Sequence, residues 1–304
     1  MGRVVVYSVD FWSGSSLSLG ASGCHDDDHL LKAKEGYLNV PFFFVRAGFY
    51  FLVWYFLSNR FYKNSVKQDQ SGEETLSIRS HRMSTYGVIL FAITVTFSSI
   101  DWVMSLTPHW YSTMWGVYTV AGAAVGSLAL ISLAALILRR LGYLQGIIST
   151  EHFHDIGKFM YGFNVFWAYI AFSQYFLIWY TNIPEESIWF IRHFSGTWNF
   201  VGIFLAVGHF AIPFFLFMSR HAKRNLSFHA LMVVWMLFVH YIDIYWVIMP
   251  NLHRRGFVYG WVDFFVLVGL GGLFVAGSIW TFSKASLYPL KDPRLSDSLH
   301  LEVY

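Results

Sequence analysis

Long apolar stretches separated by short polar ones dominate the chain, and they predict membrane-spanning helices. A spanning helix needs about 20 mostly apolar residues. Seven segments meet this requirement, at residues 39–59, 83–106, 111–138, 157–182, 196–220, 227–250 and 260–283. Their apolar runs are continuous, whereas the strands of a membrane β-barrel alternate. The pattern predicts an all-α polytopic integral membrane protein, with a helical bundle at 31–286, a separate segment at 1–30 and a C-terminal tail at 287–304.

The composition agrees with a membrane protein and excludes several other classes. Of the 304 residues, 56% are hydrophobic and 13% are charged, whereas an average soluble domain has about 25% charged residues. This excludes an ordinary soluble enzyme, a disordered chain and a coiled coil. The single cysteine, Cys24, excludes a disulfide framework, a cysteine-ligated zinc site and an iron–sulfur cluster held by this chain. We therefore expect no metal site.

The lysines and arginines lie in short loops, so they indicate topology and not a nucleic-acid partner. One side of the predicted membrane receives most of them: Arg60, Lys63, Lys67, Arg79, Arg82, Arg139, Arg140, Lys158, Arg220, Lys223, Arg224, Lys284, Lys291 and Arg294. The positive-inside rule makes this side cytoplasmic, which places the C-terminus inside and the segment before the first span outside. An odd number of spans, with the N-terminal segment outside and no evident signal peptide, suggests an N-terminally shortened form of a longer protein. The alternative is a seven-helix protein whose N-terminal tail crosses the membrane unaided.

Several polar side chains lie inside the predicted spans, where a charged group costs about 2.5–3.5 kcal/mol. Between mid-membrane and the outer face we expect Arg46, Asp101, Gln174, His209, His240 and Asp243, with Tyr245 beside the last two. His240 and Asp243 are three residues apart and share a helix face, where a carboxylate can raise the basicity of an imidazole. We interpret these residues as candidates for a proton relay or a quinone pocket. The alternative is a polar cluster that only stabilises the bundle.

Two further hypotheses concern histidines. His209 and His240 could instead be axial ligands of a haem, but the carboxylate beside His240 favours a proton partner. Near the cytoplasmic start of the fourth span, His154, Asp155 and Lys158 are candidates for proton entry. The alternative there is a solvated helix start with Asp155 or Thr150 as its N-cap.

Tryptophans and glycines add packing information. The tryptophans near predicted outer ends, which are Trp102, Trp110, Trp179, Trp198, Trp246 and Trp261, predict an interfacial aromatic belt. Gly122 and Gly126 form a small-xxx-small pair, which predicts close helix packing.

Several strings of the sequence resemble a known family. They are residues 37–43 (YLNVPFF), 101–113 (DWVMSLTPHWYST), 154–160 (HDIGKFM), 179–186 (WYTNIPEE) and 289–300 (PLKDPRLSDSLH). From about His29 to the C-terminus, the chain resembles the ActF-type membrane subunit of bacterial alternative complex III, which is related to the NrfD and polysulfide-reductase membrane subunits. The resemblance implies an NrfD-like helical bundle that lacks N-terminal helices of the family.

The resemblance also implies a function and a setting. It implies a subunit of a quinol-oxidising respiratory complex in the bacterial inner membrane, contributing quinone binding, proton translocation or both. No redox cofactor would be bound by this chain, although quinone or quinol would be a ligand. Its partners would be other membrane subunits, an iron–sulfur protein, a multihaem cytochrome c and lipid. A stand-alone secondary transporter and a purely scaffolding subunit remain alternatives.

Overall fold

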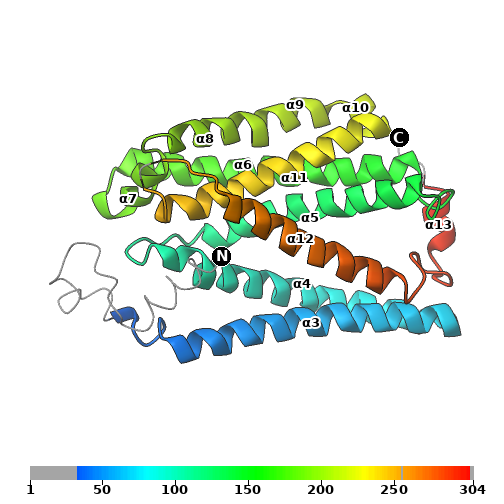
Figure 1. The fold of residues 1–304 in the computed structure, drawn as a ribbon. Helices are drawn as coiled ribbons and strands as arrows, with labels where there is room; N and C mark the ends of the chain where they lie inside the picture. The colour runs from blue at the N-terminus through cyan, green and yellow to red at the C-terminus, as the bar shows by residue number, and fades with distance from the viewer. Residues whose placement is uncertain (1–32, 255, 302–304) are drawn as a thin grey trace.

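The computed structural model describes residues 33–254 and 256–301, and these ranges contain helices and connecting segments without strands (Figure 1). The predicted separate segment at 1–30 lies outside the described residues. The long helices are α3 (Val40–Ser71), α4 (Glu74–Trp102), α5 (Trp115–Arg140), α6 (Thr150–Thr181), α11 (Leu226–Ile248) and α12 (Trp261–Phe282). The shorter elements are η1 (Met104–Leu106), α7 (Pro184–His193), α8 (Trp198–Leu205), η2 (Ala206–Ala211), α9 (Ile212–Met218), α10 (Arg220–Arg224), η3 (Met249–Asn251) and α13 (Leu295–Leu299).

The predicted all-α polytopic membrane fold is confirmed. Within the described ranges, six helical segments are long and apolar enough to cross a membrane. The remaining predicted span, the fourth at 157–182, corresponds to α6, which has 32 residues but is not among these six. Tyrosine, tryptophan, asparagine and glutamine side chains in α6 lower its apolar character, although its length would suffice.

Helices α3 and α4 form an antiparallel hairpin that extends beyond the predicted spans at 39–59 and 83–106. In these extensions, the side chains of Asn64 and Gln68 are buried and donate hydrogen bonds to Ser80 (3.1 Å) and Ser77 (2.6 Å). Gly72 ends α3 in the left-handed conformation, at φ 70°, which glycine adopts without steric cost. The predicted loop 60–82 is therefore mostly helical.

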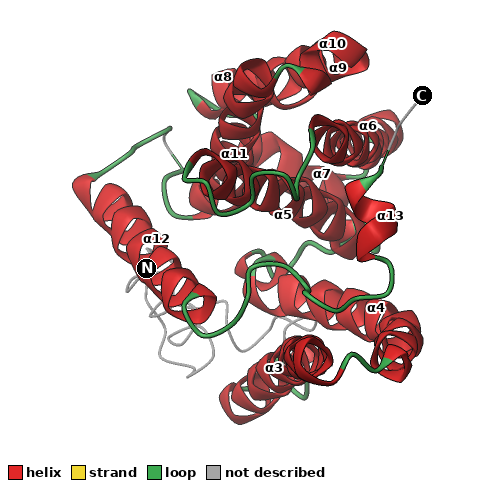
Figure 2. Cartoon of the chain, turned by 90° about the vertical axis from the view of Figure 1, so that its right-hand side faces the viewer, coloured by secondary structure: helices red, strands yellow, loops and turns green. Residues whose placement is uncertain are grey.

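Helix α5 lies at the centre of the fold and packs against α4, α6 and α11 (Figures 1 and 2). Small side chains make this possible, because Ala121, Val125 and Ala129 are fully buried along α5. The predicted span at 196–220 consists of α8, η2 and α9, and η2 is a short π-helix. Helix α12 stands apart from the bundle in Figure 2 and contains no buried residue.

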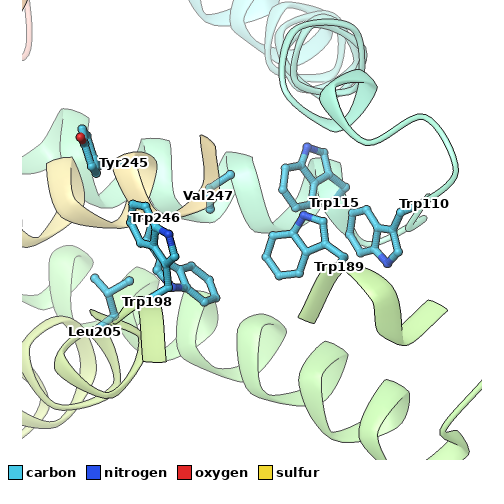
Figure 3. Close-up of a cluster of buried hydrophobic side chains, with 8 residues drawn as sticks. All are labelled: Trp110, Trp115, Trp189, Trp198, Leu205, Tyr245, Trp246 and Val247. Atoms are coloured by element: carbon cyan, nitrogen blue, oxygen red, sulfur yellow. The ribbon is translucent and has the colours of Figure 1, made fainter. Parts of the chain in front are cut away.

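The predicted aromatic belt is wrong for half of its members. Trp110, Trp198 and Trp246 are buried in a cluster together with Trp115 and Trp189, which Figure 3 shows between the helices. The ring of Trp110 stacks on that of Trp189, with ring centres 5.1 Å apart. By contrast, Trp179 and Trp261 are exposed, as a belt requires. Hydropathy cannot separate these two cases, because a tryptophan near a helix end suits either a belt or a core contact.

Candidate functional site

The structure brings His209, His240 and Asp243 together in the interior of the bundle. Each of the three offers one ligand atom, and these atoms lie within 4.8 Å of one another. His209 and Asp243 are 0% and 3% exposed. In the part of the chain that the structure describes, these are the grouped side chains that could hold a metal ion. The predicted pairing of His240 with Asp243 thus extends to His209 on a neighbouring helix segment.

Small and aromatic side chains hold the two imidazoles in place. A Cβ atom at Gly126 would lie 2.6 Å from Cδ2 of His240, and one at Gly122 would lie 3.3 Å from Cε1. The small-xxx-small pair on α5 is therefore the surface against which the His240 ring packs. The ring of His209 lies on that of Trp167 from α6, with centres 3.9 Å apart. The haem-ligand hypothesis for these two histidines stays a hypothesis.

Asp243 has a partner that the sequence analysis missed. The hydroxyl of Tyr118 on α5 donates a hydrogen bond to Oδ1 of Asp243 at 2.5 Å. The predicted span at 111–138 contains no aspartate, glutamate, lysine, arginine or histidine, so nothing in it drew attention to Tyr118. The pairing of Tyr118 with Asp243 depends on which face of α5 meets α11, and the sequence pattern does not specify this.

Both ring nitrogens of His209, and Nδ1 of His240, are buried and have no hydrogen-bond partner within the described residues. A buried polar atom left in this way costs about 1–3 kcal/mol. Such groups are normally satisfied by ordered water or by a ligand. The cluster is therefore suited to exchange hydrogen bonds with a mobile species.

A cavity of about 690 Å³ reaches this cluster between α5, α6, α7, α8 and α11. Its lining is mostly aromatic and includes Trp115, Trp167, Tyr175, Trp189, Phe194, Phe210 and Trp246. The polar side chains in the wall include Tyr118, Gln174, Asn199 and Asp243. Cavities of about 300–1,000 Å³ with such a lining are typical of sites for small organic molecules. Gln174 and Asp243, which the sequence analysis grouped together, therefore line the same cavity.

Arg46 and Asp101 form a separate site between α3 and α4 and do not line the cavity. Arg46 donates through Nε to Oδ2 of Asp101 (2.8 Å) and through Nη2 to Oδ1 (3.1 Å). The hydroxyls of Tyr37 and Tyr50 donate to the same carboxylate at 2.8 and 2.7 Å. Burial and the bond to Asp101 raise the pKa of Tyr37 to about 12. With all these donors, Asp101 is a fully paired carboxylate.

Tyr245 also lies away from the cavity lining, although it follows Asp243 closely in the sequence. Its hydroxyl donates to the carbonyl of Val258 and lies 3.3 Å from Oδ2 of Asp263. It therefore ties α11 to the connection before α12 and does not join the His240–Asp243 pair.

The second group of candidates, near the start of α6, divides into two parts. Asp155 and Lys158 form a partly exposed ion pair at 2.6 Å. His154 is buried, and burial, and then the charge of Lys223, lower its pKa. The expected N-cap at Asp155 or Thr150 is wrong, because α6 begins after Ser149, whose backbone N–H donates to Nδ1 of His152 (3.1 Å). His152 thus has a capping role.

Further buried polar groups lie between this end and the His209 cluster, and sequence reasoning did not single them out. His229 on α11 is fully buried and shares a hydrogen bond with Ser132 of α5 (2.8 Å). Its Nδ1 atom and both amide atoms of Asn164 on α6 have no partner among the described residues. A histidine inside the predicted span at 227–250 was the available signal. Asn164 had none, because its burial depends on the packing of α6.

Comparison with known proteins adds no relative. No protein-family model matches the chain, and no curated protein matches it at a significant level. The resemblance to the ActF-type subunits therefore stays a prediction, and the function is argued from the site.

Proposed function

We propose that the chain is a quinone-binding and proton-conducting membrane subunit of a quinol-oxidising respiratory complex, of the alternative complex III kind. The observation that carries this proposal is the aromatic cavity with Asp243 and Tyr118 in its wall and two histidines behind them. Such a subunit would reside in the bacterial inner membrane with its C-terminus in the cytoplasm. Its partners would be other membrane subunits, an iron–sulfur protein and a multihaem cytochrome c.

The cavity suits a quinone in two respects. Its aromatic walls offer faces on which a flat ring can stack, and a membrane-embedded site gives access to a ligand that dissolves in lipid. The polar groups Asp243, Tyr118, Gln174 and Asn199 are among the available partners for the two ring oxygens. Oxidation of a quinol releases protons together with electrons. A carboxylate in the wall is a suitable first acceptor for such a proton, whereas the electrons would pass to redox groups of the partner subunits.

The buried polar groups supply a route for protons along the bundle. Asp243 and His240 continue to His209, and Asn164, His229 with Ser132, and His154 follow toward the other end. His229 and His240 are eleven residues apart on α11, about 16 Å at 1.5 Å per residue. Asn164 is ten residues beyond His154 on α6 and so lies at an intermediate height. Unpartnered atoms along this line are places for bridging water.

Replacement of Asp243 by asparagine tests the proposal. Asparagine keeps the shape and can still accept from Tyr118, but it cannot take up a proton. We expect assembly to be preserved and quinol-dependent proton release to fall by about 10²–10⁴-fold, the range of general acid–base groups. Assembly yield, binding of a quinone analogue and proton release are measured on the same preparation of the complex. Asp297→Asn, in the exposed tail, is the matched control.

The same preparations separate the alternatives. A scaffolding subunit predicts the reverse for Asp243→Asn, namely lower stability with normal turnover in the surviving complex. A stand-alone transporter predicts that the chain purifies without iron–sulfur and multihaem partners. A haem absorption band that disappears in His209→Ala or His240→Ala would favour the haem-ligand hypothesis instead.

A further inference from the structure

A second cavity, of about 450 Å³, lies where α5 ends and α11 begins. Its lining consists of Leu136, Arg139, Arg140, Gln145, Gly146 and Leu226. We propose that this cavity binds the phosphate group of an anionic phospholipid. The proposal is independent of the quinone site, which lies between other parts of the helices.

The charges around the cavity favour an anion. Two arginines line it, and no acidic side chain does so within the described residues. The Nη1 atom of Arg139 is buried and has no acceptor in the described ranges. The carboxylate of Glu151, in the first turn of α6, is engaged by Arg224 at 2.6 Å. A guanidinium nitrogen in this position leaves a donor for an incoming oxygen, and phosphate is the group that guanidinium recognises with paired hydrogen bonds.

The position of Arg139 is constrained by its surroundings. Its guanidinium carbon lies 6.0 Å from the ring centre of Phe153, a fully buried residue of α6. This separation is at the outer limit of a cation–π contact, about 6 Å, and the burial of Nη1 restricts the positions that the guanidinium can take. Arg139 is therefore a positioned donor, in contrast to an arginine that extends freely into solvent.

The position of the cavity along the membrane normal favours a lipid headgroup over a free anion. Arg139 and Arg140 form the last turn of α5, a helix long and apolar enough to span the membrane, so they lie at the level of lipid headgroups. Leu136 and Leu226 supply apolar lining beside the two arginines. Basic pockets between membrane helices are known to bind acidic headgroups. Basic residues also favour a helix C-terminus in general, but that effect requires no cavity and no buried unpartnered nitrogen.

Binding of phosphatidylglycerol to the delipidated full chain in detergent tests this proposal. Phosphatidylcholine and inorganic phosphate serve as comparison ligands, and binding is measured by native mass spectrometry and by the shift in Tm. We expect phosphatidylglycerol to bind and to raise the Tm more than either comparison ligand does. The double variant Arg139→Gln/Arg140→Gln should bind it about tenfold more weakly, for a loss of one to two charge-assisted contacts. The matched control Arg79→Gln/Arg82→Gln removes two exposed arginines of α4 and should bind normally.

A cysteine at Gln145, in a Cys24→Ser background, reports on the cavity with both arginines present. Phosphatidylglycerol should slow its reaction with a hydrophilic maleimide, and phosphatidylcholine should not. Equal weakening of binding in the two double variants would overturn the proposal. It would mean that lipid binding depends on the net charge of the protein and not on the arginines of the cavity. Equal protection by inorganic phosphate would overturn the lipid assignment in favour of a free anion. If Arg139→Gln/Arg140→Gln fails to fold, the absence of protection at Gln145→Cys is the result that overturns it.

Discussion

At the scale of single residues, the space beside His240 depends on two glycines of α5. A methyl group at Gly126 would approach Cδ2 of His240 to 2.6 Å, a distance that real Cβ contacts do not show. At Gly122 the corresponding distance of 3.3 Å is tight but requires only a small shift. The position of the imidazole relative to Asp243 is therefore coupled to the absence of side chains on a different helix.

Alanine substitution at these glycines should produce graded effects. Gly126→Ala should displace His240 and reduce quinol-dependent proton release more strongly than Gly122→Ala. Gly277→Ala on α12 is the control, since a Cβ there meets nothing within 4 Å, and alanine is the better helix former. Proton release and the Tm are measured for the three variants. Equal activity of Gly126→Ala and Gly277→Ala would contradict a role for the His240 position.

The Arg46–Asp101 pair leads to a prediction about stability. Both side chains are buried, and removal of one partner from a buried ion pair costs about 3–5 kcal/mol because the other charge is left uncompensated. Asp101→Asn should therefore lower the Tm of the detergent-solubilised protein markedly. The double variant Arg46→Met/Asp101→Leu should recover much of this loss, since apolar replacement of a whole buried pair is often neutral. A normal Tm for Asp101→Asn would show that the carboxylate is not required for stability.

Sequence reasoning identified residues whose relation is local and missed those whose relation is tertiary. His240 and Asp243 were paired because their spacing places them on one face of one helix. Tyr118 and His229 have partners on other helices, and a periodic pattern does not specify which faces meet. For the same reason, Arg46 and Asp101 were grouped with Asp243, although the structure places them in a site of their own.

At the scale of elements, the span formed by α8, η2 and α9 departs from a regular helix where it carries His209. The π-helical turn Ala206–Ala211 contains this residue, and Pro213 follows in the first turn of α9. Proline has no N–H to donate within a helix, and π-turns occur frequently at functional sites. The indole of Trp235 on α11 donates to the carbonyl of Gly208 (2.8 Å). The distorted turn is therefore bonded directly to α11.

Loss of this bond should loosen the turn that holds His209. Trp235→Phe keeps an aromatic ring but removes the donor, and a hydrogen bond of this kind contributes about 0.5–1.5 kcal/mol. We expect a moderately lower Tm and faster amide hydrogen exchange within 206–211. Trp261→Phe is the control, because Trp261 is 79% exposed. Unchanged exchange in Trp235→Phe would mean that the π-turn is stable without its bond to α11.

Apolar length predicted where helices cross the membrane, but it did not predict where they end. Helices α3 and α4 continue well past their apolar parts, because polar side chains such as Asn64 and Gln68 pair between the two helices. When each segment is considered alone, polar residues of this kind predict a loop. The π-turn was equally hidden, since Ala206–Ala211 has the apolar composition of any spanning helix.

At the scale of the whole molecule, three contacts gather distant segments at one end of the bundle. Asp69 accepts from the backbone N–H of Leu290 (2.7 Å), and the Lys291 ammonium donates to the carbonyl of Gln70 (2.8 Å). His152 and Ser298 share a hydrogen bond of 3.0 Å. The end of α3, the start of α6 and the C-terminal tail therefore lie together, although α12, which leads into the tail, buries none of its residues.

This arrangement, combined with the positive-inside rule, gives a prediction of topology. The end that contains the tail also carries most of the basic residues, so it should face the cytoplasm. In a Cys24→Ser background, Ser296→Cys on the exposed tail should react in intact cells with a membrane-permeant maleimide but not with an impermeant one. Glu185→Cys, on the exposed surface of α7 at the opposite end of the bundle, should react with both. The reverse pattern would invert the orientation and would place the proposed lipid cavity at the outer leaflet. Labelling of both positions by the impermeant reagent would mean that the two ends of the bundle do not lie on opposite sides of the membrane.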